Sequence, residues 1–158
     1  EIASCLVGSE MCIRDSIYAP LFVNSEEVRD SLEQEPNIKG CLELARNADI
    51  ILTSVGSIVY KSWKSYLSTR DLYNLEKKGA IGHIGGHFYD MEGNEVITPF
   101  VNKMIGLGIE DIKNTENVIC VAGLEMKAEA ILGAVRGGYI NTLITDEEAA
   151  KAVLALCK

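Results

Sequence analysis

Apolar and polar positions follow two different periods along this chain, and the two periods alternate. Short apolar runs bounded by glycine or polar residues predict strands, whereas apolar residues three to four positions apart predict helices. The predicted strands span residues 49–55, 80–84, 96–98, 117–122 and 139–144. The predicted helices are one starting at Ser25, one carrying the stripe Ile38, Cys41, Leu42 and Ala45, and others over 69–78, 109–113, 126–136 and from Asp146 through Leu156. Residues 58–68 fit neither period, and Trp63 and Tyr66 are expected to cover an apolar surface there.

Strands that alternate with helices are typical of an α/β fold with a mainly parallel sheet covered by helices on both faces. The 158 residues suffice for one such domain. Ligands of these folds bind beyond the carboxyl ends of the strands. Three junctions are therefore candidates: Gly56-Ser57, residues 85–90 and residues 123–127.

The charge balance argues against nucleic acid as a direct partner. The net charge is -8, and an acidic surface repels phosphate backbones, so any contact with DNA is expected from residues outside this chain. No apolar run is long enough for a membrane-spanning helix. The five cysteines are scattered without a C-x-x-C pair, which favours reduced thiols and a cytoplasmic location over a disulfide framework or a zinc site.

Two of the junctions could hold an anion. Gly56 allows close backbone approach, and Ser57 adds a hydroxyl; the alternative is an ordinary turn at the end of a strand. Gly123 precedes a predicted helix with Lys127 in its first turn. Free N–H groups and the helix dipole there favour an anionic ligand, whereas the alternative for Lys127 is a solvated surface lysine.

The glycine-rich segment 82–90 allows three interpretations. His83, His87 and Asp90 could be metal ligands, but the glycines between the histidines argue against the helix that would align them. Asp90 could hold a turn or accept hydrogen bonds from sugar hydroxyls. Gly85 and His87 are candidate ligand-binding residues on the same segment. We expect no metal and no cofactor.

Asp146 follows the last predicted strand. One interpretation is that it caps the helix that begins there, and the other is that it binds a ligand. No spacing supports a Ser-His-Asp triad, a paired acid and base, or a Walker-type phosphate loop. We therefore expect no catalytic residues.

Four motifs in order resemble the sugar-binding (effector) domain family of SorC/DeoR-type transcriptional regulators. They are residues 48–58, residues 79–84 with 88–93, residues 121–123 with 127–131, and residues 143–147, and the resemblance runs from about Ala19 to the C-terminus. It implies a fold related to phosphosugar isomerases and deaminases, and a phosphorylated sugar as effector. It also implies a tetrameric homo-oligomer whose N-terminal helix-turn-helix binds operator DNA.

The resemblance implies a role for each candidate residue. Gly56 and Ser57 would form a pocket wall, Asp90 would hold sugar hydroxyls, and Lys127 would meet the phosphate or a sugar oxygen. The chain departs from the family in having Leu124 where a second glycine is usual and His83 where an acid is usual. The family's first strand, its glycine-and-threonine phosphate loop and its helix-turn-helix have no counterpart here.

The first sixteen residues do not fit this domain. The run from Ser4 to Ser16 resembles the translation of sequencing-adapter DNA, so we expect residues 1–16 to be non-native and 17–158 to form a domain truncated at its N-terminus. The main hypothesis is a sensing domain without turnover. The alternative is a phosphosugar isomerase or deaminase of the same fold, with Asp90 or His87 as proton shuttle.

Overall fold

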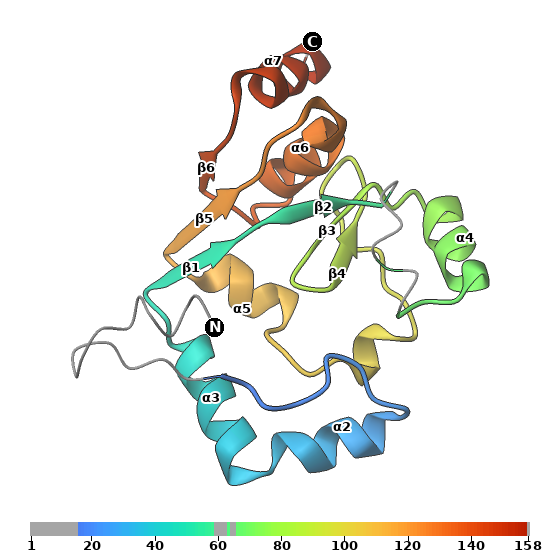
Figure 1. Ribbon diagram of the computed structural model, residues 1–158, viewed down its shortest axis with the longest axis vertical. Helices are drawn as coiled ribbons and strands as arrows, with labels where there is room; N and C mark the ends of the chain where they lie inside the picture. The colour runs from blue at the N-terminus through green and yellow to red at the C-terminus, as the bar shows by residue number, and fades with distance from the viewer. Residues whose placement is uncertain (1–15, 59–62, 64–65, 158) are drawn as a thin grey trace, which may run out of the picture.

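Two small sheets lie at the centre of the molecule (Figure 1). The structure is a computed structural model that describes residues 16–58, 63 and 66–157. The first sheet is parallel, with strand order β1-β5-β6, and the second is antiparallel, with order β2-β3-β4. Their bounds are β1 Ile50–Thr53, β5 Asn117–Val121 and β6 Thr142–Ile144, and β2 Val55–Ser57, β3 Gly82–Ile84 and β4 His87–Tyr89.

The helices follow the predicted positions closely. They are α2 Glu26–Glu33, α3 Pro36–Arg46, α4 Thr69–Lys77, α5 Ile109–Asn114, α6 Ala128–Arg136 and α7 Glu147–Leu156, with the short 3-10 helices η2 Val101–Lys103 and η3 Glu125–Lys127. Ser25 caps α2, Ser68 forms a capping box with Asp71 at α4, and Asp146 caps α7. Each cap accepts a backbone N–H that the first turn of a helix cannot satisfy by itself.

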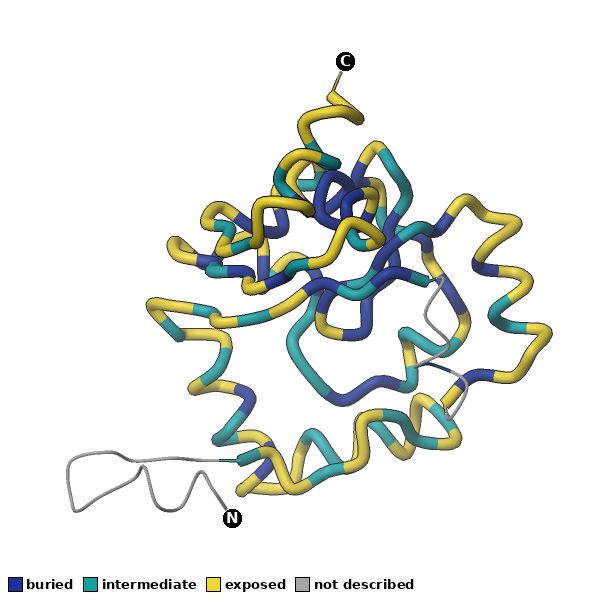
Figure 2. Tube along the Cα trace, turned by 45° about the horizontal axis from the view of Figure 1, so that its top comes forward, coloured by how far each residue is buried: buried dark blue, intermediate teal, exposed yellow. Residues whose placement is uncertain are grey.

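One face of the parallel sheet forms the main core. Val118 and Cys120 of β5 alternate with exposed neighbours and point into a cluster with residues of α5 and α6. Ile131 of α6 is fully buried in this cluster. The buried segments of the tube in Figure 2 gather where these elements meet. Because every second side chain of a strand points the same way, the alternation predicted from sequence sets the covered face.

The structure corrects the prediction of a single, mainly parallel sheet. The predicted strand 49–55 divides at Ser54 into β1 and β2, and β2 leaves the parallel sheet to pair with β3. Gly85 and Gly86 both have positive φ, at 57° and 96°. Two such residues form the hairpin turn that folds β4 back on β3. Residues 96–98 form no strand; the bridge there joins Tyr89 to Glu95.

The prediction that helices cover both faces of the parallel sheet is also wrong for the described residues. The helices that pack against the parallel sheet do so through the residues of its buried face, and the other face stays exposed.

A second apolar cluster confirms the role expected of Trp63. Its side chain is buried with Leu75, Phe88 and Val96. Tyr66 is largely exposed, but its ring lies 5.8 Å from that of Trp63. Residues 59–62 and 64–65 of this segment lie outside the described residues, as do residues 1–15 of the segment expected to be non-native.

Candidate functional site

A pocket of about 420 Å³ lies beyond the carboxyl ends of β1 and β5. Three segments form it: the passage from β1 into β2, the middle of β3, and the loop that leads into η3. The lining residues are Ser54, Val55, Gly56, Ser57, His83, Leu124 and Lys127. The sheet thus brings two of the three predicted junctions to one place, where the ends of parallel strands meet.

Gly56 is required by the packing of this pocket. Gly56 pairs with His83 across the β2–β3 ladder. A Cβ on Gly56 would lie 2.1 Å from Nε2 of His83. The imidazole therefore lies directly over the Gly56 backbone, and any side chain there would push it into the pocket.

Rings also hold His83 on its other sides. The ring of Trp63 meets it edge-on at 4.9 Å, and Phe88 lies 5.6 Å away. Burial, together with the smaller effect of the charge of Lys127, lowers the pKa of His83 from 6.5 to about 4. At neutral pH the pocket therefore presents a neutral imidazole, which can donate at one nitrogen and accept at the other.

This pKa predicts an acid-sensitive stability. A histidine whose pKa is about 4 in the folded state and 6.5 when unfolded stabilises the fold fully above pH 6.5, and the contribution is lost as the pH falls toward 4. Between pH 7 and pH 5 the free energy of unfolding should fall by about 2 kcal/mol. A His83→Asn variant should show a flatter profile over this interval in urea titrations. An unchanged slope in that variant would contradict a neutral, buried His83.

Lys127 supplies the positive charge of the pocket. It stands at the N-cap of α6, where no side chain caps the helix. Among the described residues, no carboxylate lies within ion-pair distance of its ammonium group. A half-buried lysine at a helix N-terminus with no acidic partner is suited to an anionic ligand.

Gly123 and Asp146 lie against each other beside the loop that carries Leu124 and Lys127. The carboxylate of Asp146 accepts hydrogen bonds from the backbone N–H groups of Ala149 and Leu124, both at 2.7 Å, and these lower its pKa. A Cβ on Gly123 would lie 2.2 Å from the same carboxylate. Asp146 therefore caps α7 and also fixes the loop that carries Lys127.

Leu124 has a strained backbone in this loop. Its φ is 78°, and it is the one non-glycine residue with positive φ among the described residues. This conformation is one that glycine adopts more readily than leucine. Leucine is tolerated because the bond to Asp146 holds the loop in place.

A Leu124→Gly substitution is accordingly expected to raise the free energy of unfolding by about 1 kcal/mol, since strain of this kind costs more than the added freedom of glycine in the unfolded chain. Leu154→Gly is the matched control, because Leu154 is exposed on the helix α7. Glycine in a helix should lower the stability there by roughly 1 kcal/mol. If both substitutions changed the free energy of unfolding in the same direction in urea titrations, the result would argue against strain at Leu124.

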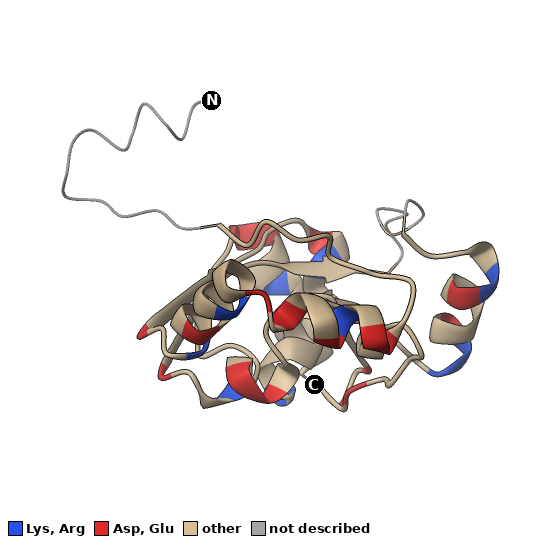
Figure 3. Cartoon of the chain, turned by 90° about the horizontal axis from the view of Figure 1, so that it is seen from below, with Lys and Arg blue, Asp and Glu red and all other residues tan. Residues whose placement is uncertain are grey.

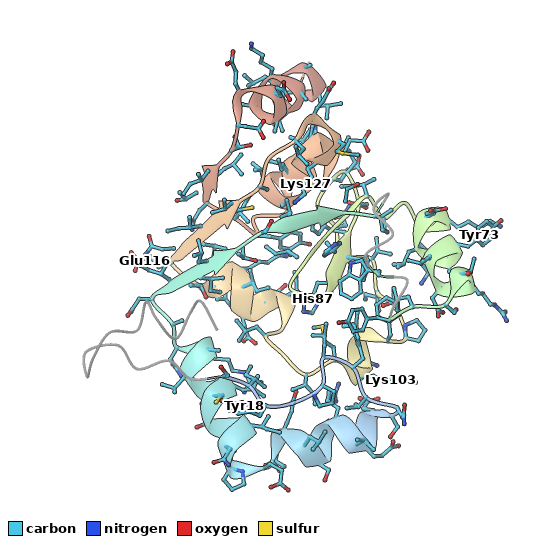
Figure 4. All side chains as sticks on the ribbon, viewed as in Figure 1. Tyr18, Tyr73, His87, Lys103, Glu116 and Lys127 are labelled. Carbon is cyan, nitrogen blue, oxygen red and sulfur yellow. The ribbon has the colours of Figure 1, made fainter. Side chains whose placement is uncertain are left out.

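Five predicted residues do not line this pocket: Gly123 and Asp146, which lie beside the loop of Lys127, and Gly85, His87 and Asp90. Gly85 forms the β3–β4 turn. His87 is buried, with Nδ1 2.8 Å from Oε1 of Glu95 and Nε2 3.0 Å from the carbonyl oxygen of Leu107. Lys127 and His87 lie well apart in Figure 4.

Asp90 is engaged in a turn. Its carboxylate accepts backbone N–H groups from Glu92 and Asn94 and the side-chain amide of Asn94, at 2.8–3.1 Å. These contacts agree with the turn interpretation of Asp90; its role in holding sugar hydroxyls stays a prediction. The proton-shuttle roles considered for Asp90 and His87 lose their basis, because both side chains are committed to structural contacts.

Four lining residues were not among the predicted ligand-binding residues: Ser54, Val55, His83 and Leu124, of which Leu124 lies within the predicted junction 123–127. His83 was considered only as a metal ligand, although alternation along β3 places it opposite the buried Ile84. In the part of the chain that the structure describes, no three His, Cys, Asp or Glu side chains form a group suited to a metal ion. No described helix is long and apolar enough to cross a membrane.

A larger hollow of about 680 Å³ adjoins the pocket at Leu124 and separates α6 from α7. Alanines, Met126 and Leu156 line it, and its charged groups are Glu125 and Glu129. Because it presents carboxylates and no cation, it suits an anionic ligand less well than the pocket at Lys127.

The sequence matches the family model described as "putative sugar-binding domain" over residues 9–155. The transcriptional regulator LsrR of Escherichia coli K12 is 35% identical over 149 residues, which are 90% of this chain and 47% of that protein. The chain thus spans about half the length of the curated relatives it matches. These relatives are transcriptional regulators and not enzymes.

Solved structures agree with this match. The sugar-binding domain of a transcriptional repressor from Vibrio fischeri is 30% identical, with a TM-score of 0.79 over 89% of this chain and 58% of that one. The full-length sorbitol operon regulator SorC from Klebsiella pneumoniae is 26% identical, with a TM-score of 0.81 over 85% of this chain and 45% of that one. The chain belongs to the sugar-binding domain family of SorC/DeoR-type transcriptional regulators.

Proposed function

We propose that the pocket at Gly56, Ser57, His83 and Lys127 binds a phosphorylated sugar, and that the domain is the effector-sensing part of a transcriptional regulator. The observation that carries this proposal is the convergence of two predicted junctions on one pocket with a single cation. Family membership supports a sugar as ligand, and the unpaired charge of Lys127 supports a phosphate on it.

Each lining group has a part in this proposal. The ammonium group of Lys127 binds the phosphate, and the backbone at Gly56 allows the ligand to approach closely. The neutral imidazole of His83 exchanges hydrogen bonds with a sugar hydroxyl. Gly123 and Asp146 hold the loop of Lys127 in place and contribute to binding indirectly.

The proposal extends to the intact regulator. Operator DNA is bound by a helix-turn-helix outside this chain, since the chain itself is acidic. The intact protein is a cytoplasmic homo-oligomer, and the sugar changes how its DNA-binding parts are arranged. The names of the curated relatives support regulation, and the relation to phosphosugar isomerase folds belongs to this proposal as well.

Trp63 provides the readout that tests the proposal. It is the single tryptophan of the chain, and its ring lies 4.9 Å from that of His83 in the pocket. Titration with glucose 6-phosphate, fructose 6-phosphate and ribose 5-phosphate should change its fluorescence saturably for at least one of them. The unphosphorylated sugars should give no response at the same concentrations, and inorganic phosphate a weaker one.

Two results would reject this function. Equal affinity for a sugar and its phosphate would show that Lys127 does not bind a phosphate. Conversion of the bound phosphosugar above the uncatalysed rate would show an enzyme in place of a sensor.

A further inference from the structure

A groove of about 260 Å³ lies between the helix α4 and the segment 98–100. Among the residues that line it are Asp71, Asn74, Lys77 and Lys78 of α4 and its C-cap, and Thr98 of the segment. None of the residues that line the pocket at Lys127 lines this groove as well. Tyr73 of α4 and Lys127 also lie well apart in Figure 4, so the groove and the pocket are separate places.

The hydroxyl of Thr98 lacks the partner that a buried polar group needs. Thr98 is 5% exposed, and in the part of the chain that the structure describes its Oγ1 makes no hydrogen bond. Leaving such a group unpaired costs free energy, and native structures retain few of them. Rotation about χ1 exchanges the positions of the hydroxyl and the methyl group. Because Thr98 lines the groove, its hydroxyl can serve a molecule that binds there.

Two lysines bring positive charge to the same groove. The ammonium group of Lys78 donates a hydrogen bond to the carbonyl oxygen of Ile97 at 3.0 Å, which holds it at the residue before Thr98. An ammonium group has three N–H donors, so two of them remain for a ligand. Lys77 adds a second ammonium group, 5.0 Å from the centre of the Tyr73 ring. Among the described residues, no carboxylate lies within ion-pair distance of either lysine.

The one carboxylate among the named groove residues is already engaged. Oδ2 of Asp71 accepts hydrogen bonds from the backbone N–H and the hydroxyl of Ser68, at 3.2 and 2.6 Å. Asp71 precedes Lys78 by seven residues, which is about 10 Å along a helix. Figure 3 shows basic groups at both ends of α4 and acidic groups between them. The charge of Asp71 is therefore distant from the end of the groove where Lys78 and Thr98 meet.

We propose that this groove is a second ligand site, which binds an oxyanion group of a small metabolite, a carboxylate or a phosphate, between Lys78 and Thr98. The ammonium group and the hydroxyl both donate hydrogen bonds, and an oxyanion accepts them. The volume is below that of a pocket for a drug-sized molecule, which limits the ligand to a small one. The site shares no residue with the pocket proposed for the phosphosugar, so either proposal can fail without the other.

Thr98→Val tests the hydroxyl in the absence of ligand. Valine keeps a similar shape and removes the unpaired group, so the melting temperature should rise by about 2 °C or more. Thr115→Val is the matched control, because Thr115 is also buried but its hydroxyl donates to the carbonyl oxygen of Asp111 at 2.9 Å. This control variant should melt at a lower temperature than the unsubstituted chain.

Binding is measured on the 158-residue chain by NMR titration with inorganic phosphate, sn-glycerol 3-phosphate and succinate. The amide signals of Asn74 and Thr98 should shift saturably with at least one of them. A response to the two phosphates alone assigns the site to a phosphate, and a response to succinate alone assigns it to a carboxylate. Thr98→Val should weaken the affinity about 3- to 10-fold and Lys78→Met about 10-fold.

Three controls place the anion in this groove. Thr115→Val, Lys151→Met and Lys127→Met should each leave the affinity within about twofold of that of the unsubstituted chain. The absence of a saturable shift with all three probes would overturn the proposal. Equal weakening by Lys78→Met and Lys151→Met would overturn it too, since the anion would then respond to the overall charge. Loss of the shifts in Lys127→Met would assign the anion to the other pocket, and a lower melting temperature for Thr98→Val would show a structural hydroxyl.

Discussion

A Gly93→Ala substitution is expected to lower the free energy of unfolding by roughly 3 kcal/mol or more. Gly93 has a φ of 82°, and an added Cβ would lie 2.1 Å from the backbone nitrogen of Gly137. The obstacle is main chain and not a flexible side chain, so the two loops must separate. Their separation would also break the 2.6 Å hydrogen bond from the hydroxyl of Tyr139 to the carbonyl oxygen of Gly93.

Gly79→Ala is the matched control for this effect. Gly79 has nearly the same φ, 81°, but nothing lies within 4 Å of the Cβ that alanine would add. Gly79→Ala should lower the free energy of unfolding by about 1 kcal/mol, which is the cost of the left-handed conformation alone. Urea unfolding of both variants separates the conformational cost from the packing cost. Equal losses would show that the contact between Gly93 and Gly137 contributes nothing to stability.

The helices of this fold could be predicted because their signals are local. Ser25 and Asp146 are caps with acidic residues following them, and both predicted helix starts are confirmed. The parallel strands were predicted from apolar runs for the same reason. The residues that end each run then indicated the edge of the sheet at which Gly56 and Lys127 meet.

The second sheet was not predicted because its signal depends on backbone conformation and on pairing over a distance. Gly85-Gly86 was interpreted as the end of a strand, although two glycines between apolar residues also fit a two-residue hairpin. The consequence reaches the pocket: antiparallel pairing of β2 with β3 brings His83 over Gly56. Nothing in the local sequence indicates that pairing, so the sequence alone gives no reason to place His83 in the pocket.

The role expected of Asp90 illustrates a different limit. Its carboxylate had two possible uses, and the sequence could not decide between them because a turn residue and a sugar ligand have the same chemistry. In the structure both carboxylate oxygens of Asp90 accept hydrogen bonds, from Asn94 and from the backbone N–H of Glu92. His83, unlike Asp90, lines the pocket, and its binding of a sugar hydroxyl belongs to the proposed function.

A Lys127→Met substitution is expected to weaken phosphosugar binding about 10- to 100-fold, which is the loss of one hydrogen bond between charged groups. Methionine keeps most of the apolar stem, so the packing of η3 is retained. Because the charge of Lys127 lowers the pKa of His83, its removal should also raise that pKa without ligand. The pKa should stay below 6.5, since burial is the larger cause. NMR titration of the imidazole measures this shift.

Lys151→Met is the control that separates this pocket from a general effect of charge. Lys151 is exposed on α7 and pairs with Glu147, outside the residues that line the pocket. Lys151→Met changes the net charge by the same amount as Lys127→Met. The phosphosugar affinity of the Lys151→Met variant should stay within about twofold of that of the unsubstituted protein, since an exposed ion pair contributes little. If both variants lost affinity equally, the anion would be attracted by the overall field of the domain. If Lys127→Met alone lost affinity and alone moved the pKa of His83, the phosphate and the imidazole would share one site.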